Sequence, residues 1–183
     1  MVESFHVGPE IAAKEFGKMA DKKKMSKEIR ILDVGAGTGL VGEWLQKLGY
    51  TNLDALDCSV DMLEVAKLKE VEGRKVFKHC HVAWLGEELD IETDSYDSWI
   101  CVGTFTEAHV RGNCMPELVR IVKPGGLICF TIRNCVVDDP DYEYNVYMQR
   151  LIDEKKWKLL VRKEEKYNIR EKINCQLFFY EVL

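Results

Sequence analysis

The stretch LDVGAGTG, residues 32–39, limits the folds open to this chain more than any other feature. An apolar run at residues 29–34 leads into this stretch. The stretch contains Gly35, Gly37 and Gly39, and a helical pattern follows it. Glycine permits the positive φ of a tight turn and leaves room for a ligand beside the backbone. A strand, a glycine turn and a helix predict a βαβ unit with a nucleotide-type site at the turn. A tight turn that binds no ligand is the alternative.

Strand-like and helix-like runs alternate along the rest of the chain. Strands are predicted at residues 29–34, 52–57, 75–83, 96–105 and 127–132, and helices at 9–23, 41–48, 60–70, 115–122 and 142–156. This alternation predicts right-handed βαβ units around a largely parallel sheet, an α/β fold. Two late runs, 157–167 and 174–183, have only a short charged stretch between them and predict an antiparallel C-terminal strand pair at one edge. Ligands of such sheets bind at the carboxyl ends of the strands.

A length of 183 residues suits one domain. We expect residues 1–28 to form an N-terminal helix and a basic loop, and residues 29–183 to form the core. The net charge of −5 argues against a general nucleic-acid binder. Residues 14–30 are locally basic, with seven basic and three acidic residues. A solvated helix end and loop explains this cluster better than an RNA or membrane contact.

The cellular location of the chain is predicted from features that the sequence lacks. No run reaches the roughly 18 apolar residues of a membrane span, and the N-terminus has no long apolar stretch. The seven cysteines are scattered and never spaced as CxxC, which is typical of a reduced intracellular chain. The sequence therefore predicts a soluble, cytoplasmic monomer without membrane partners, with the nucleus left open as a second compartment.

The short motif HCH at residues 79–81 invites a metal interpretation. On a strand, His79 and His81 would share one face and Cys80 would lie on the other. No second group of ligands has a matching spacing, so we predict that no metal binds.

The spacing of the glycines selects among ligands. Dinucleotide sites favour GxGxxG, which places a helix N-terminus against the pyrophosphate. Here the glycines form GxGxG, and Leu40 stands where the third glycine of the dinucleotide pattern belongs. Asp33, just before the turn, would repel a pyrophosphate and attract an ammonium or sulfonium group. The pattern therefore favours a ligand with a cationic amino-acid end.

Asp57 favours a nucleoside. It ends the predicted strand 52–57 and lies 18 positions after Gly39, close to the offset of about 20 residues expected of a carboxylate that accepts the ribose hydroxyls. The alternative role is a cap on the next helix, which Ser59 can fill instead. We therefore expect Asp57 to bind a ribose.

A family resemblance is carried by four segments, ILDVGAGTG, LDALDCS, YDSWICVGTF and ELVRIVKPGGLICFTIR, in this order. Together they resemble the class I S-adenosylmethionine-dependent methyltransferases, from about Ile29 to the end of the chain. Each segment alone is weak, whereas the combination is specific. The resemblance implies a Rossmann-like class I methyltransferase sandwich with S-adenosylmethionine as cofactor and S-adenosylhomocysteine as product. It also implies transfer of a methyl group to a small molecule or a protein.

The resemblance assigns cofactor contacts to matching positions. Asp33, Gly35, Ala36 and Gly37 would face the methionine part, and Asp57, Cys58 and Met62 would hold the ribose and one face of the adenine. Trp84 and Leu85 would flank the other face, and Val102, Gly103 and Thr104 would lie near the sulfonium and the acceptor. For Trp84 the alternative is an aromatic side chain that covers the edge of the core.

The catalytic residues stay unknown at this point. A general base is needed only if the attacking atom must lose a proton. The weak candidates are His109 and Glu107, with His81 behind them, and for His109 a polar loop residue is an equal alternative. The segment GTFTEAH at 103–109 does not match the Asn/Asp-Pro-Pro-Tyr tetrad of adenine and glutamine methylators, which disfavours those acceptors without naming another.

Two other classes of function stay open. One is an S-adenosylmethionine- or S-adenosylhomocysteine-binding protein without transferase activity. Relatives usually carry an aromatic-rich helix ahead of the position of Pro9 that covers the cofactor, and no such segment precedes Pro9 here. The other is an NAD-binding Rossmann enzyme, against which Leu40 and Asp33 count.

Overall fold

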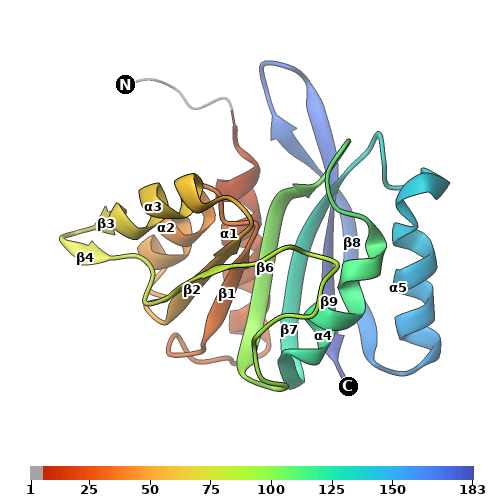
Figure 1. Ribbon diagram of the computed structural model, residues 1–183, viewed down its shortest axis with the longest axis horizontal. Coiled ribbons are helices and arrows are strands. Elements are labelled where there is room, and N and C mark those ends of the chain that lie inside the picture. The colour runs from red at the N-terminus through yellow and green to blue at the C-terminus, as the bar shows by residue number, and fades with distance from the viewer. Residues whose placement is uncertain (1–5) are drawn as a thin grey trace.

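The computed structural model describes residues 6–183 as a seven-stranded sheet covered by helices on both faces (Figure 1). The first five residues of the predicted N-terminal segment lie outside the described residues. The strand order is β5-β2-β1-β6-β7-β9-β8. Strands β5, β2, β1, β6 and β7 are parallel, and β9 runs antiparallel to both of its neighbours. The predicted α/β class with a mostly parallel sheet is confirmed.

The elements follow the predicted alternation. The strands are β1 (Ile31–Val34), β2 (Leu53–Asp57), β3 (Glu70–Val71), β4 (Arg74–Lys75), β5 (Cys80–Val82), β6 (Tyr96–Phe105), β7 (Val122–Arg133), β8 (Trp157–Asn168) and β9 (Ile173–Val182). The helices are α1 (Gly8–Lys22), α2 (Leu40–Lys47), α3 (Val60–Leu68), α4 (Met115–Arg120) and α5 (Tyr144–Asp153), with short 3-10 turns η1 (Gly112–Cys114) and η2 (Pro140–Tyr142). None of the helices within residues 6–183 combines the length and the apolar character that crossing a membrane requires.

The late strands pair as predicted, but their order in the sheet was not foreseen. The last strand, β9, lies between β7 and β8, so β8 forms the edge. Since β9 is antiparallel to both neighbours, β8 runs in the same direction as the parallel strands. Its carboxyl end therefore lies at the same edge of the sheet as the ends of β1, β2 and β6.

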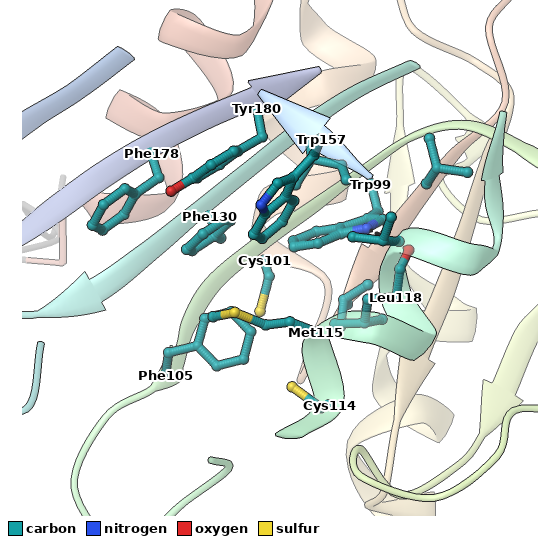
Figure 2. Packing of buried hydrophobic residues seen from close by; sticks show 14 of the residues in the cluster. Trp99, Cys101, Phe105, Cys114, Met115, Leu118, Phe130, Trp157, Phe178 and Tyr180 are labelled. Atoms are coloured by element: carbon teal, nitrogen blue, oxygen red, sulfur yellow. Dashed lines mark hydrogen bonds between the residues drawn. The ribbon is translucent and has the colours of Figure 1, made fainter. Parts of the chain in front are cut away.

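Each face of the sheet carries its own apolar core. One core lies under α1, α2 and α3 and includes Phe16, Leu45 and Leu63. The other lies under α4 and α5 and is rich in aromatic side chains, as Figure 2 shows around Phe130. The Phe130 ring stacks on those of Phe178, Tyr180, Trp99 and Trp157 with centroids 5.1–6.2 Å apart. These rings fix β6, β7, β9 and β8 relative to one another, which holds the strand ends that form the cavity described below.

The predicted third strand at 75–83 is wrong in its extent. Only Cys80–Val82 joins the main sheet, and residues 74–75 form a small hairpin with β3 instead. The reason is that Val76 and Phe77 are both buried, although they are neighbours in sequence. Phe77 packs so closely on Gly42 of α2 that a Cβ there would lie 2.3 Å from the Phe77 ring. The chain bends to cover α2 before it enters the sheet.

Candidate functional site

A cavity of about 670 Å³ opens at the carboxyl ends of the parallel strands. The turns after β1, β2 and β5, the end of β6 with its following loop, and the end of β8 all contribute to its wall. Its lining is Gly35, Gly37, Leu56, Asp57, Cys58, Ser59, Met62, Ala83, Trp84, Leu85, Val102, Gly103, Thr104, Ala108, His109, Val110, Arg111, Asn113 and Tyr167. This is the edge at which ligands of open α/β sheets bind.

Two glycines of the turn after β1 have different roles. Gly35, Gly37 and Gly39 all have positive φ, at 66°, 52° and 81°. A Cβ on Gly35 would lie 1.9 Å from Oγ1 of Thr104, so this glycine makes room for the end of β6 rather than for a ligand. A Cβ on Gly37 would meet no protein atom within 4 Å. Gly37 therefore presents bare backbone to the cavity.

Asp57 fixes the shape of this turn. One carboxylate oxygen accepts the Gly37 N–H at 2.8 Å, and the other accepts the Ser59 N–H at 2.9 Å. The Ser59 hydroxyl accepts the Met62 N–H at 3.3 Å, so Ser59 provides the helix cap predicted from the sequence. Since each carboxylate oxygen has a second lone pair, Asp57 can still accept hydrogen bonds from a ligand in the cavity.

Asp33 is a buried acid behind the turn, with 1 % of its surface exposed. Its Oδ2 accepts the Gly42 N–H at 3.1 Å, and its Oδ1 has no partner among the described residues. Burial raises the pKa of the carboxyl to about 7, and the negative charge of Asp57 adds to the rise. A cationic group nearby would offset this cost.

The structure gathers most of the residues assigned to the cofactor in one cavity. Those that line it are Gly35, Gly37, Asp57, Cys58, Met62, Trp84, Leu85, Val102 and Gly103, with Thr104 beside them. Asp33 and Ala36 do not line it. Ala36 is 8 % exposed and packs into the core under α1 to α3. Their roles in binding stay predictions, as do those of the lining residues.

Tyr167 is a lining residue that the sequence analysis missed. Its hydroxyl lies so close to Gly103 that a Cβ there would be 2.3 Å away, and the Arg133 guanidinium lies 5.6 Å from its ring centroid. Burial raises the pKa of the Tyr167 phenol, so the hydroxyl stays protonated and can donate. Tyr167 lies near the carboxyl end of β8. Because β8 runs in the same direction as β1, β2 and β6, this end lies at the ligand-binding edge of the sheet, and knowing that direction would have identified Tyr167.

The loop after β6 contributes more residues to the cavity than the sequence predicted. It forms one wall with Ala108, His109, Val110, Arg111 and Asn113. Of the candidate bases, His109 lines the cavity, whereas Glu107 and His81 do not. Nδ1 of His109 lies 2.6 Å from the backbone oxygen of Glu107. Because a carbonyl oxygen only accepts, Nδ1 carries the proton and Nε2 of the neutral ring has a free lone pair.

The two histidines of the HCH motif belong to a hydrogen-bond network that lies away from the cavity, toward the amino-terminal ends of the strands. Nδ1 of His79 lies 2.9 Å from a carboxylate oxygen of the buried Asp54, and Nε2 of His81 lies 3.3 Å from the Tyr96 hydroxyl. Arg30 and Tyr96 both donate to the other oxygen of Asp54. Within residues 6–183, no three or more His, Cys, Asp or Glu side chains gather as a metal site.

Comparison with known proteins identifies similar sequences and folds. A family model described as a methyltransferase domain matches residues 32–130. Methyltransferase-like protein 27 of Homo sapiens is 32% identical over 124 residues, 67% of this chain and 47% of that protein. Malonyl-[acyl-carrier protein] O-methyltransferase 2 of Ilyobacter polytropus is 30% identical over 188 residues, 90% of this chain and 70% of that protein. The alignment thus spans about half the length of the human protein.

A solved structure shares the fold over almost the whole chain. Magnesium protoporphyrin IX methyltransferase from Synechocystis PCC 6803, with bound SAM, superposes with a TM-score of 0.71. The match covers 97% of this chain and 81% of that chain, at 12% sequence identity. At this identity the comparison establishes the fold alone.

Proposed function

This chain belongs to the class I S-adenosylmethionine-dependent methyltransferases, and we propose that it transfers a methyl group from S-adenosylmethionine to a small molecule or a protein side chain. The observation that carries the proposal is the cavity at the strand ends, where the family's glycine turn and the Asp57 carboxylate face the same space.

The residues of the cavity fit this cofactor. Gly37 offers backbone with open space above it, as a ligand in close contact with the turn requires. Asp57 has acceptor capacity for ribose hydroxyls, and Met62 and Trp84 are 46% and 63% exposed apolar side chains at the mouth. Asp33 lies behind the glycine turn and outside the lining, and its unpartnered oxygen suits a cationic amino-acid end that reaches the turn. The bound cofactor supplies a methyl group on a positively charged sulfur that an electron-rich atom can displace.

The chain's own residues then align the acceptor and exclude water. Gly103 and Thr104 line the cavity from the end of the central strand β6, and the Tyr167 hydroxyl reaches Gly103 from the edge strand β8. His109 lies on the facing loop. When the acceptor atom carries a proton, Nε2 of His109 is the group oriented to take it, since Nδ1 is held by the Glu107 carbonyl.

Acceptor class, assembly and location are part of the same proposal. The net charge of −5 supports a small-molecule or protein acceptor over a nucleic acid. The cysteines within residues 6–183 are all unpaired, which supports a reducing compartment such as the cytoplasm. We propose a monomer, to be tested by sedimentation.

Calorimetry with one nucleoside ligand and one dinucleotide tests the cofactor. We expect S-adenosylhomocysteine to bind and NAD not to, because the turn lacks the glycine spacing that places a helix N-terminus against a pyrophosphate. Tight binding of NAD alone would overturn the proposal. Incubation with methyl-labelled S-adenosylmethionine and a cell extract then separates a transferase from a protein that only binds, since only a transferase yields a labelled product.

The ribose role predicts a loss of affinity when Asp57 is removed. We expect Asp57→Ala to weaken S-adenosylhomocysteine binding by about 1–3 kcal/mol, because the ribose hydroxyls lose a charged acceptor. Asp61→Ala is the matched control, since Asp61 is an exposed carboxylate at the start of α3 outside the cavity. Binding is measured by calorimetry at a temperature where both variants are folded by circular dichroism. An unchanged affinity of Asp57→Ala would refute the ribose role.

A further inference from the structure

The cavity has two sides that differ in charge. On the side of the glycine turn, Asp57 is the one carboxylate among the described lining residues, and both of its oxygens already accept backbone N–H groups. On the facing side, the loop after β6 contributes one permanently charged group, the Arg111 guanidinium. The loop side therefore carries a positive charge, and no described carboxylate lines the cavity there.

The Arg111 side chain forms no hydrogen bond or ion pair with any of residues 6–183. In contrast, Arg120 on α4 is paired with Glu117 at 2.6 Å. Val110 and Leu85 line the cavity with Arg111. Arg111 is exposed, so an entering ligand can reach its guanidinium, and a guanidinium prefers planar, bidentate contact with an oxyanion.

The backbone on both sides of Arg111 is anchored, so its side chain starts from a fixed point. The Ala108 N–H donates to the Tyr142 hydroxyl at 2.8 Å, and the Tyr144 hydroxyl donates to the Val110 carbonyl. On the other side, Gly112 packs on the backbone so closely that a Cβ would lie 2.8 Å from the Glu143 oxygen. The loop is thus held against residues 142–144 on both sides of Arg111.

We propose that the methyl acceptor of this chain carries a carboxylate group and that Arg111 binds it. The inference rests on the proposed function, since it assigns the acceptor side of the same cavity. Arg111 fixes the carboxylate at the loop wall, which leaves the rest of the acceptor to extend toward Gly103 and Tyr167.

A carboxylate fits this wall better than a phosphate does. A phosphate ester dianion is usually held by more than one cation or by a helix N-terminus, and Arg111 is a single cation. Glu87 and Glu88 line a shallow hollow that shares Asn113 with the cavity. Their charges oppose a dianion more strongly than a monoanion. A monoanionic carboxylate meets Arg111, the single guanidinium among the described residues that line the cavity, with the smaller electrostatic penalty.

Small aromatic probes test the proposal on the intact protein saturated with S-adenosylhomocysteine. Benzoate, benzamide and phenyl phosphate have similar size, and they differ in charge. We expect benzoate to bind at least about tenfold more tightly than benzamide, because only the anion forms charge-assisted hydrogen bonds with Arg111. Affinities are read from ligand-observed NMR titrations, which detect millimolar binding.

The variants locate the effect. Arg111→Gln should remove the preference for benzoate, whereas Arg74→Gln, at an exposed arginine on the β3–β4 hairpin, should keep it. Arg111→Lys retains the charge without the bidentate geometry and should show an intermediate preference. The affinity of each variant for S-adenosylhomocysteine reports that the fold is intact.

The outcomes separate the two proposals. Equal or undetectable binding of benzoate and benzamide to the S-adenosylhomocysteine complex overturns the acceptor inference and leaves the proposed function standing. A preference for benzoate that persists in Arg111→Gln also overturns it, and tighter binding of phenyl phosphate overturns the assignment to a carboxylate. Failure of the wild type to bind S-adenosylhomocysteine overturns the proposed function itself.

Discussion

Replacing Gly37 by alanine is expected to lower the affinity for S-adenosylhomocysteine about 100-fold, at about 1.4 kcal/mol for each factor of ten. The added methyl group would meet no protein atom within 4 Å, so it would occupy the space that the backbone leaves open to the cavity. The ligand then loses its close contact with the turn, and the Gly37 N–H that Asp57 accepts shifts with it. Calorimetry of the variant and the wild type measures the change.

Gly73→Ala is the matched control for this prediction. Gly73 has φ of 73°, compared with 52° at Gly37, and a Cβ there also meets nothing within 4 Å. Both substitutions place alanine in the left-handed region, at a cost of about 1–2 kcal/mol. Both variants should therefore lose similar stability, and only Gly37→Ala should lose affinity. Equal affinities of the two variants would show that the turn does not contact the cofactor.

The second large effect concerns stability and pH. Asp33 has a pKa of about 7 in the folded chain, compared with 3.8 when it is solvated. The folded state therefore keeps a proton that the unfolded state has released, and the free energy of unfolding falls as pH rises through this window. Between pH 5 and pH 8 the Asp33 contribution falls by about 2–3 kcal/mol, at about 1.4 kcal/mol per pKa unit.

Asp33→Asn isolates this contribution, because asparagine has no proton to lose. Other groups also titrate in the window: burial lowers the pKa of His81, which makes stability rise with pH. The difference between the wild type and the variant removes such shared contributions. We expect urea unfolding to show the variant gaining on the wild type from pH 5 to pH 8. A difference that does not change with pH would mean that Asp33 is ionised throughout.

A bound cationic ligand should lower the pKa of Asp33 and so reduce the cost of ionising this carboxyl. The ammonium group of S-adenosylhomocysteine would stabilise the ionised carboxylate of Asp33, so binding should release protons just below pH 7. Calorimetry in buffers of different ionisation enthalpy counts these protons, and Asp33→Asn should abolish the release.

The alternation of apolar runs and glycine turns was enough to predict most of the fold. The predicted strand 96–105 matches β6 residue for residue, and the Ser59 cap was foreseen from a hydroxyl before an amphipathic run. Such features are encoded locally, in a few neighbouring residues. The third strand was misjudged because the burial of Val76 and Phe77 depends on α2, to which no local pattern points.

The candidate site was predictable on one side and not on the other. The glycine turn and Asp57 belong to the β1–α2–β2 unit, and Met62 lies in the next helix, α3, so their common location follows from local chain order. Tyr167 and Arg111 reach the same cavity from β8 and from a loop without periodicity. Their positions depend on the order of strands in the sheet and on the anchoring of the loop, and both are long-range properties of the chain.

The place of β9 between β7 and β8 sets an order of events during synthesis on the ribosome. Strand β8 emerges first, yet its neighbour in the sheet is β9, which follows it in the chain. Until β9 is made, β7 is an open sheet edge and β8 has no strand to pair with, a state prone to aggregation. Tyr167 is part of β8, so it reaches its place in the cavity only when β8 joins the sheet. The part of the cavity that Tyr167 lines is thus completed only when residues 173–182 have been inserted, so a nascent chain that already has the glycine turn and Asp57 cannot yet form the complete cavity.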